Sequence, residues 1–207
     1  MPSMPVLILF AHPALEKSRV NRHLVAAARE VDGVTVHDLY EAYPDFFVDV
    51  KHEQDLLTAH DVIVFHHPFY WYSTPPLLKQ WEDLVLEHGW AYGSGGTALR
   101  GKTFLSVVTT GGRENAYVEG GYNRFTVRQL LAPIEQTARL CGMRVLPPFV
   151  VHGTHRMTSD EVAGHARDYA AVLTALHQGT LDPDRLQDLT RLNADLRSVL
   201  PPSAGTV

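Results

Sequence analysis

The 207-residue sequence contains one cysteine, Cys141, which excludes a disulfide framework and any zinc or iron–sulfur site built from several cysteines. No apolar stretch approaches the ~20 residues that cross a bilayer. Residues 1–5 lack the basic region and the apolar core of a signal peptide. The sequence also lacks a basic run, and its formal net charge of −5 argues against a nucleic-acid surface. These absences predict a soluble, cytoplasmic protein that does not bind nucleic acid.

The residues that are present are typical of one globular domain with an added terminal segment. Apolar residues make up 45% of the chain and charged residues 20%, so a substantial core can form. The regular pattern of strands and helices ends near Gly179. We therefore expect one domain over residues 1–178 and a C-terminal helical arm and tail over residues 179–207. Within the latter, residues 182–200 are expected to form an appended helix and residues 201–207 a frayed tail.

Apolar runs and amphipathic stretches alternate along the chain. Residues 6–10 form a continuous apolar run, which is typical of a parallel strand covered on both faces. This alternation predicts an α/β fold with a five-stranded parallel sheet and helices on both faces. Strands are expected at residues 6–10, 34–39, 62–65, 103–108 and 145–151, the last interrupted by Pro147 and Pro148, and helices at residues 20–31, 51–59, 77–86, 125–140 and 159–178.

The first candidate site follows the first strand and consists of His12 and the segment Ser18-Arg19-Val20-Asn21. A helix that begins near Ser18 directs free N–H groups and its positive dipole end toward the mouth of this strand, which suits a phosphate. Ser18, Asn21 and His12 would add side-chain donors. An equally good interpretation is that Ser18 is only a helix cap and His12 only a turn residue.

The second candidate site is an aromatic loop after the third strand, Pro68-Phe69-Tyr70-Trp71-Tyr72. Four consecutive aromatic residues are unusual in a surface loop, and they can form the wall of an apolar slot for a planar ring. A hydrophobic lid or a subunit interface would also explain them.

The third candidate site is Thr109-Thr110-Gly111-Gly112, directly after the fourth strand. Glycines there let backbone N–H groups approach a ligand edge without obstruction by a Cβ atom. Because the carboxyl ends of parallel strands meet at one edge of the sheet, the three loops together predict a site for a phosphate and a flat ring, as in a flavin site.

Other polar motifs are weaker candidates. The pairs His66-His67 and His152/His155 have no carboxylate at ligand spacing, so we expect no metal site. Cys141 stands at the end of a helix, where a buried, apolar role is expected.

As a set, these motifs resemble the flavodoxin-like NAD(P)H quinone reductases, and above all the ancillary oxidoreductase subunits of glutathione-regulated potassium efflux systems. The resemblance extends over about residues 6–173. It is carried by residues 10–13, 18–21, 68–72, 77–81 and 109–112, and by the stretches 39–45, 89–93 and 96–102.

This resemblance implies a flavodoxin-like three-layer sandwich and a homodimeric flavoprotein with FMN or, alternatively, FAD. NAD(P)H would reduce the flavin, leave, and be replaced by a quinone in a two-electron ping-pong reaction. His12 and residues 18–21 would hold the phosphate, residues 69–72 would border the isoalloxazine, and residues 109–112 would bond its pyrimidine edge.

The resemblance also implies that Tyr117 is an active-site tyrosine. Larger members of the family pair this tyrosine with a histidine a few residues later. Here Tyr122, Asn123 and Arg124 occupy that neighbourhood, so no catalytic pair is assigned.

A second hypothesis comes from the same resemblance: a regulatory subunit that binds a membrane potassium-efflux transporter, peripherally at the inner face of the membrane. The aromatic loop and the C-terminal arm would be its contact surfaces. A simple electron carrier is less favoured, because residues 69–72 resemble the walls of substrate-accepting reductases. The choices between NADH and NADPH, between FMN and FAD, and among electron acceptors remain open.

Overall fold

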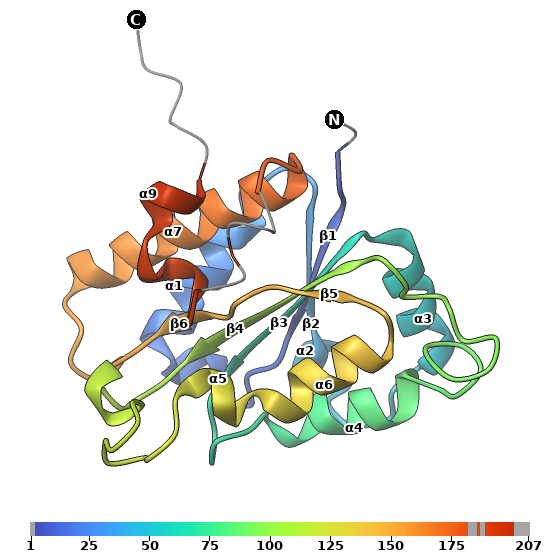
Figure 1. Ribbon diagram of the computed structural model, residues 1–207, viewed down its shortest axis with the longest axis horizontal. Coiled ribbons are helices and arrows are strands. Elements are labelled where there is room, and N and C mark those ends of the chain that lie inside the picture. The colour runs from blue at the N-terminus through green and yellow to red at the C-terminus, as the bar shows by residue number, and fades with distance from the viewer. Residues whose placement is uncertain (1–2, 182–185, 187–188, 201–207) are drawn as a thin grey trace, which may run out of the picture.

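In the computed structural model, which describes residues 3–181, 186 and 189–200, the apolar segments of the chain form one parallel sheet (Figure 1). The strand order is β2-β1-β3-β4-β5, and β6 also pairs with β4. This is the order of the flavodoxin-like doubly wound fold. The strands are β1 (Val6–Phe10), β2 (Val34–Asp38), β3 (Val62–Pro68), β4 (Thr103–Thr109), β5 (Arg144–Val145) and β6 (Phe149–Val151).

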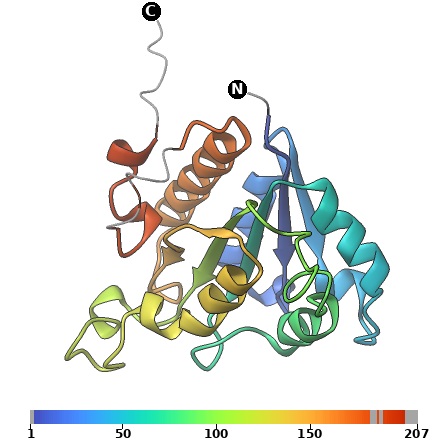
Figure 2. The same cartoon turned by 45° about the vertical axis from the view of Figure 1, so that its right-hand side comes forward.

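Helices cover both faces of this sheet, so the predicted three-layer sandwich is confirmed (Figures 1 and 2). Alternate side chains of β1 point to opposite faces, with Leu7 and Leu9 in one core cluster and Val6, Ile8 and Phe10 in the other. One face carries α1 (Arg19–Arg29) and α7 (Ser159–His177). The other carries α2 (Leu39–Ala42), α3 (Val50–Ala59), α4 (Pro76–Val85), α5 (Val127–Leu130) and α6 (Ala132–Leu140).

The fifth strand is divided, as Pro147 and Pro148 suggested. Both β5 and β6 pair in parallel with β4, and the two prolines lie between them. A proline has no N–H group to donate to a neighbouring strand, so the ladder is interrupted there. The fifth position of the predicted sheet is therefore filled by two short strands.

The prediction of one continuous helix over residues 125–140 is wrong. Thr126 caps α5 in a capping box with Gln129, and α5 ends at Leu130. Pro133 lies in the first turn of α6, where its missing N–H does no harm, but its ring cannot continue a preceding helix. Two short helices therefore replace the long one.

Two other boundaries differ from those predicted. Leu39 was expected to end the second strand, but Asp38 accepts hydrogen bonds from the N–H groups of Tyr40 and Glu41 and so starts α2. The third strand continues to Pro68, which carries His66 and His67 into the buried sheet.

In the described part of the C-terminal arm, the expected single helix over residues 182–200 is replaced by η3 (Leu192–Ala194) and α9 (Leu196–Val199). This part of the arm lies beside α7 (Figure 2). Residues 182–185 and 187–188 of the expected helix, and the expected tail at residues 201–207, lie outside the described residues. None of the helices described is both long enough and apolar enough to cross a bilayer.

Candidate functional site

A cavity of about 810 Å³ opens at the carboxyl ends of the strands, where the three predicted loops meet. The loops after β1, β3 and β4 all contribute to its wall, as does the loop after β6. The predicted residues that line it are His12, Ser18, Arg19, Val20, Asn21, Pro68, Phe69, Tyr70, Trp71, Thr109 and Gly111. Tyr72, Thr110, Gly112 and Tyr117 are not part of the lining.

The sequence analysis missed one whole segment of this wall, Thr154 to Met157, together with Ala14 and Lys17. The segment follows β6 at the same edge of the sheet as the other loops. The strand-end argument applied to the first, third and fourth strands would have found it. In the sequence, the motif containing His155 is weighed only as a candidate metal site.

Ser18 caps α1, as both interpretations of this segment expect. Its Oγ accepts hydrogen bonds from the Asn21 backbone N–H at 3.3 Å and from the Asn21 side chain at 2.9 Å. Within the described residues, the N–H groups of Arg19 and Val20 donate to no protein acceptor. A helix leaves such groups free in its first turn, and here both residues border the cavity.

Asn21 ties α1 to the sheet through a buried polar network. Only 2% of its surface is exposed. Its Nδ2 donates to Thr109 Oγ1 at 3.1 Å, and its Oδ1 lies 3.1 Å from His66 Nε2. Burial lowers the pKa of His66 to about 3, so this ring is neutral and donates from Nε2. The amide predicted to face a phosphate is thus largely engaged inside the protein.

His12 provides an uncharged donor at the cavity wall. Its Nδ1 accepts from the Ala14 N–H at 3.1 Å. Burial lowers the pKa of His12, so the ring is neutral at pH 7 and carries its proton on Nε2.

Hydrogen bonds to the end of β6 and the loop after it hold the Thr109–Gly112 loop in place. Backbone hydrogen bonds join Thr110 to Val151 and Thr154, and Gly153 to Gly112. Within the described residues, the N–H groups of Gly111 and Gly112 donate to no protein acceptor. Of the two, Gly111 lines the cavity, so its N–H can reach a ligand there.

The two glycines of this loop also make room for neighbouring side chains. A Cβ atom on Gly111 would lie 2.5 Å from His155 Nε2, and one on Gly112 would lie 2.9 Å from Tyr117 Cε2. A larger residue at Gly111 would therefore displace the His155 ring from the cavity wall, and one at Gly112 would displace the Tyr117 ring.

The aromatic loop presents its rings at the mouth of the cavity. Trp71 is 94% exposed, and both Trp71 and Tyr72 adopt positive φ angles of 50° and 64°. Such angles cost on the order of 1 kcal/mol each in a residue other than glycine. Tyr72 donates to Asn123 Oδ1 at 3.1 Å, which connects this loop to the segment that carries Tyr117.

Tyr117 has a histidine neighbour that the sequence analysis did not identify. Its ring lies 5.4 Å from that of His152 and 6.3 Å from that of Phe69. His152 Nδ1 lies 3.1 Å from Thr110 Oγ1, which itself donates to the Gly112 carbonyl. Burial lowers the pKa of His152 to about 4 and raises that of Tyr117. Both rings are therefore neutral at pH 7.

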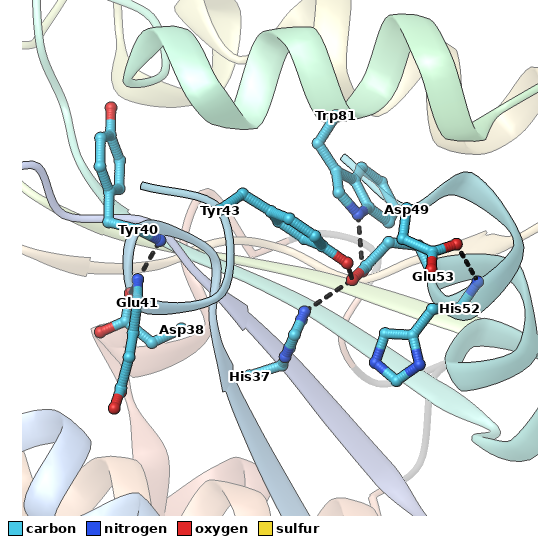
Figure 3. Close-up of polar contacts among 9 residues, drawn as sticks. All are labelled: His37, Asp38, Tyr40, Glu41, Tyr43, Asp49, His52, Glu53 and Trp81. Carbon is cyan, nitrogen blue, oxygen red and sulfur yellow. Dashed lines mark hydrogen bonds and ion pairs between the residues drawn. The ribbon is translucent and has the colours of Figure 1, made fainter. Parts of the chain in front are cut away.

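A second polar cluster lies away from this cavity, between β2, α3 and α4 (Figure 3). Glu53 is fully buried and accepts from His37, Tyr43 and Trp81. Ligand atoms of His37, His52 and Glu53 lie within 4.8 Å of one another. Because protein donors already occupy both oxygens of Glu53, this cluster fits a structural role better than a metal site.

Comparison with known proteins supports the fold. Residues 4–173 match the family described as having a flavodoxin-like fold. The chain is 51% identical over 164 residues to the glutathione-regulated potassium-efflux system ancillary protein KefG of Serratia proteamaculans (strain 568), covering 79% of this chain and 90% of that one.

Two solved structures are also similar. General stress protein 14 of Treponema denticola, in complex with FMN, is 44% identical with a TM-score of 0.79, covering 83% of this chain and 98% of that one. A protein described as an NADPH-quinone reductase from P. pentosaceus is 36% identical with a TM-score of 0.76 and the same two coverages. From the strand order and from these similarities together, we conclude that the chain belongs to the family of flavodoxin-like proteins.

Proposed function

We propose that this protein is an FMN-dependent NAD(P)H:quinone oxidoreductase. The observation that carries the proposal is the cavity, in which unpaired backbone donors from two loops flank a wall of aromatic rings. The FMN complex and the quinone reductase among the similar structures support the same assignment. FAD is the alternative cofactor.

The residues of the cavity fit the two polar ends of FMN. The N–H groups of Arg19 and Val20, the Ser18 hydroxyl and His12 Nε2 would hold the phosphate at the start of α1. The N–H group of Gly111 would bond the pyrimidine edge and stabilise negative charge there as a fixed dipole. Phe69, Tyr70 and Trp71 would border the ring system and exclude water.

The chemistry that FMN supplies when bound is two-electron transfer between a nicotinamide and a quinone. The protein would position the flavin and its substrates and would supply a hydrogen-bond donor beside them. Tyr117 retains its proton at Oη at neutral pH, because burial raises its pKa, and it can donate that proton in a hydrogen bond. His152, with Nδ1 directed at Thr110 Oγ1, keeps the Tyr117 ring against Phe69.

The visible absorption spectrum of the purified protein, before and after anaerobic NADPH, tests this function. We expect a flavin spectrum that bleaches with NADPH and returns when menadione is added. Gly111→Val should weaken FMN binding at least about tenfold, because its side chain would displace His155. Gly164→Ala in α7 is the matched control, since the nearest atom to a Cβ there is Arg167 Nη2 at 4.0 Å, an ordinary contact distance. A wild-type protein that stays colourless after soaking in FMN and FAD would exclude the proposed function.

The second candidate function is that of an ancillary subunit of a potassium efflux system, and the similarity to KefG favours it. In this form the protein would be a homodimer that binds a membrane transporter from the cytoplasm. Purification with such a transporter would support it. A free dimer with high quinone turnover would favour the enzyme alone.

A further inference from the structure

The C-terminal arm forms hydrogen bonds with the outer edge of β6, the strand that precedes the cavity segment Thr154–Met157. β6 pairs with β4 on one side, and Asn193 of η3 bonds its other side. The Val150 N–H donates to Asn193 Oδ1 at 3.0 Å, and Asn193 Nδ2 donates to the Val150 carbonyl at 2.9 Å. The Leu192 N–H donates to the Pro148 carbonyl at 2.8 Å. These bonds satisfy backbone groups that an edge strand would otherwise leave open.

Apolar side chains anchor this part of the arm. Leu186 and Leu192 are essentially fully buried, and Val199 is 8% exposed. All three belong to the core cluster between α1, α7 and the sheet. The burial of these apolar side chains therefore fixes the position of the arm. Its polar side chains are then held against β6 and the neighbouring loops.

An ion pair connects the arm directly to the segment that carries Tyr117. Arg191 Nη2 lies 2.9 Å from Glu114 Oε1, in η2 (Glu114–Ala116), and the Tyr117 N–H bonds back to the Glu114 carbonyl. Arg191 is mostly buried, with 24% of its side chain exposed, whereas Glu114 is 59% exposed.

We propose that the arm is a positioning element for the cavity: Asn193 fixes β6, which holds the Thr110–Gly112 loop, and Arg191 fixes residues 113–121 with Tyr117. The role of these loops toward FMN rests on the proposed function. The family match ends at residue 173, so this element lies beyond the part of the chain matched by that family. Arg191 and Asn193 are thus positioning residues, since neither lines the cavity.

Hydrogen–deuterium exchange of the full-length protein without added flavin tests the positioning itself. Arg191→Gln should speed exchange in residues 113–121 about two- to fivefold, the range expected for a partly exposed ion pair. Asn193→Leu should speed exchange of the Val150 and Thr110 amides about tenfold, because the Val150 N–H loses its acceptor and β6, whose Val151 carbonyl accepts from the Thr110 N–H, loses its anchor. Arg197→Gln, an exposed arginine in α9 of the same arm, should leave both segments unchanged.

A charge exchange separates positioning from general destabilisation. Arg191→Glu alone should speed exchange in residues 113–121, and adding Glu114→Arg should restore slow exchange there.

In the flavin-loaded protein, Arg191→Gln should lower the rate of reduction by NADPH about threefold while changing the FMN Kd less than twofold. Exchange that matches the Arg197→Gln control, or no rescue by the double variant, would overturn the proposal. A wild type that binds no flavin would overturn the function instead, because the exchange pattern does not depend on it.

Discussion

Two buried glutamates on the same face of the sheet have opposite electrostatic environments. Glu53 in α3 is fully buried, and Glu82 in α4 is 7% exposed. They lie close in the fold, since Trp81, next to Glu82 in the chain, donates to Glu53. The difference between them shows what a carboxylate requires in order to remain charged inside a protein.

Glu53 keeps its charge because three side chains donate to it. His37 Nε2 lies 2.7 Å and Tyr43 Oη 2.5 Å from Oε1, and Trp81 Nε1 donates to Oε2 at 2.7 Å (Figure 3). Burial alone would raise the pKa of Glu53, but these hydrogen bonds outweigh it and hold the pKa below the ordinary value.

Among the described residues, no side chain donates a hydrogen bond to the Glu82 carboxyl group. Its charged neighbours are Lys79 and Asp83 on its own helix, and burial raises its pKa to about 7. It lies close enough to Cys141 that, together with burial, it raises the pKa of that thiol to about 11. Because both carboxyl groups are buried, the number of hydrogen-bond donors around each one decides which of the two is ionised.

Removing the carboxylate of Glu53 should have the largest effect on stability. Glu53→Leu leaves three buried donors without an acceptor, and we expect a loss of about 4 kcal/mol in the free energy of unfolding. Asp55→Ala on the same helix is the control: its side chain is 62% exposed and pairs only with Lys51, so the loss should stay below about 0.5 kcal/mol. Urea denaturation measures the free energy of unfolding of both variants. Equal losses in the two would contradict the role of Glu53 as the acceptor for its three buried donors.

The raised pKa of Glu82 should make stability fall as pH rises. The folded protein retains a proton that the unfolded chain releases above its ordinary pKa of 4.5. Stability from this group is therefore complete below pH 4.5 and lost as pH rises toward 7, by about 3 kcal/mol in total. Glu82→Gln should remove this dependence. The difference in unfolding free energy between wild type and variant, measured from pH 4 to pH 8, should change in this window and stay constant above it.

Deleting one donor from the Glu53 cluster should have the smallest effect of the three. Tyr43→Phe removes the hydroxyl at 2.5 Å but leaves His37 and Trp81 in place. We expect a loss of about 2 kcal/mol, within the range for one hydrogen bond to a charged group. If Tyr43→Phe lost as much unfolding free energy as Glu53→Leu, the prediction that His37 and Trp81 still stabilise the Glu53 carboxylate would be wrong.

The sheet and the position of the cavity could be predicted because they depend on local pattern. The apolar run Val6–Phe10, the cap at Ser18 and the glycines at 111 and 112 are all visible along the chain. The rule that parallel strands end at one edge then brings their loops together.

The contacts that complete the site could not be predicted, because residues distant in the sequence make them. The His152 ring lies beside that of Tyr117 and its Nδ1 contacts Thr110, and His66 of β3 contacts Asn21 of α1. The arm could be recognised as an addition, but its role could not, since Asn193 and Arg191 resemble ordinary surface residues in sequence. Proline explains both interruptions of the predicted elements, between α5 and α6 and within the fifth strand.

The aromatic loop has a spectroscopic consequence. Of the three tryptophans in the chain, Trp81 is 1% exposed and Trp90 is half-buried, whereas Trp71 is 94% exposed at the cavity wall. Emission at long wavelength should therefore come mainly from Trp71, and a ligand that enters the cavity should quench it before it affects the other two. The wild-type chain thus carries its own fluorescent reporter of cavity occupancy.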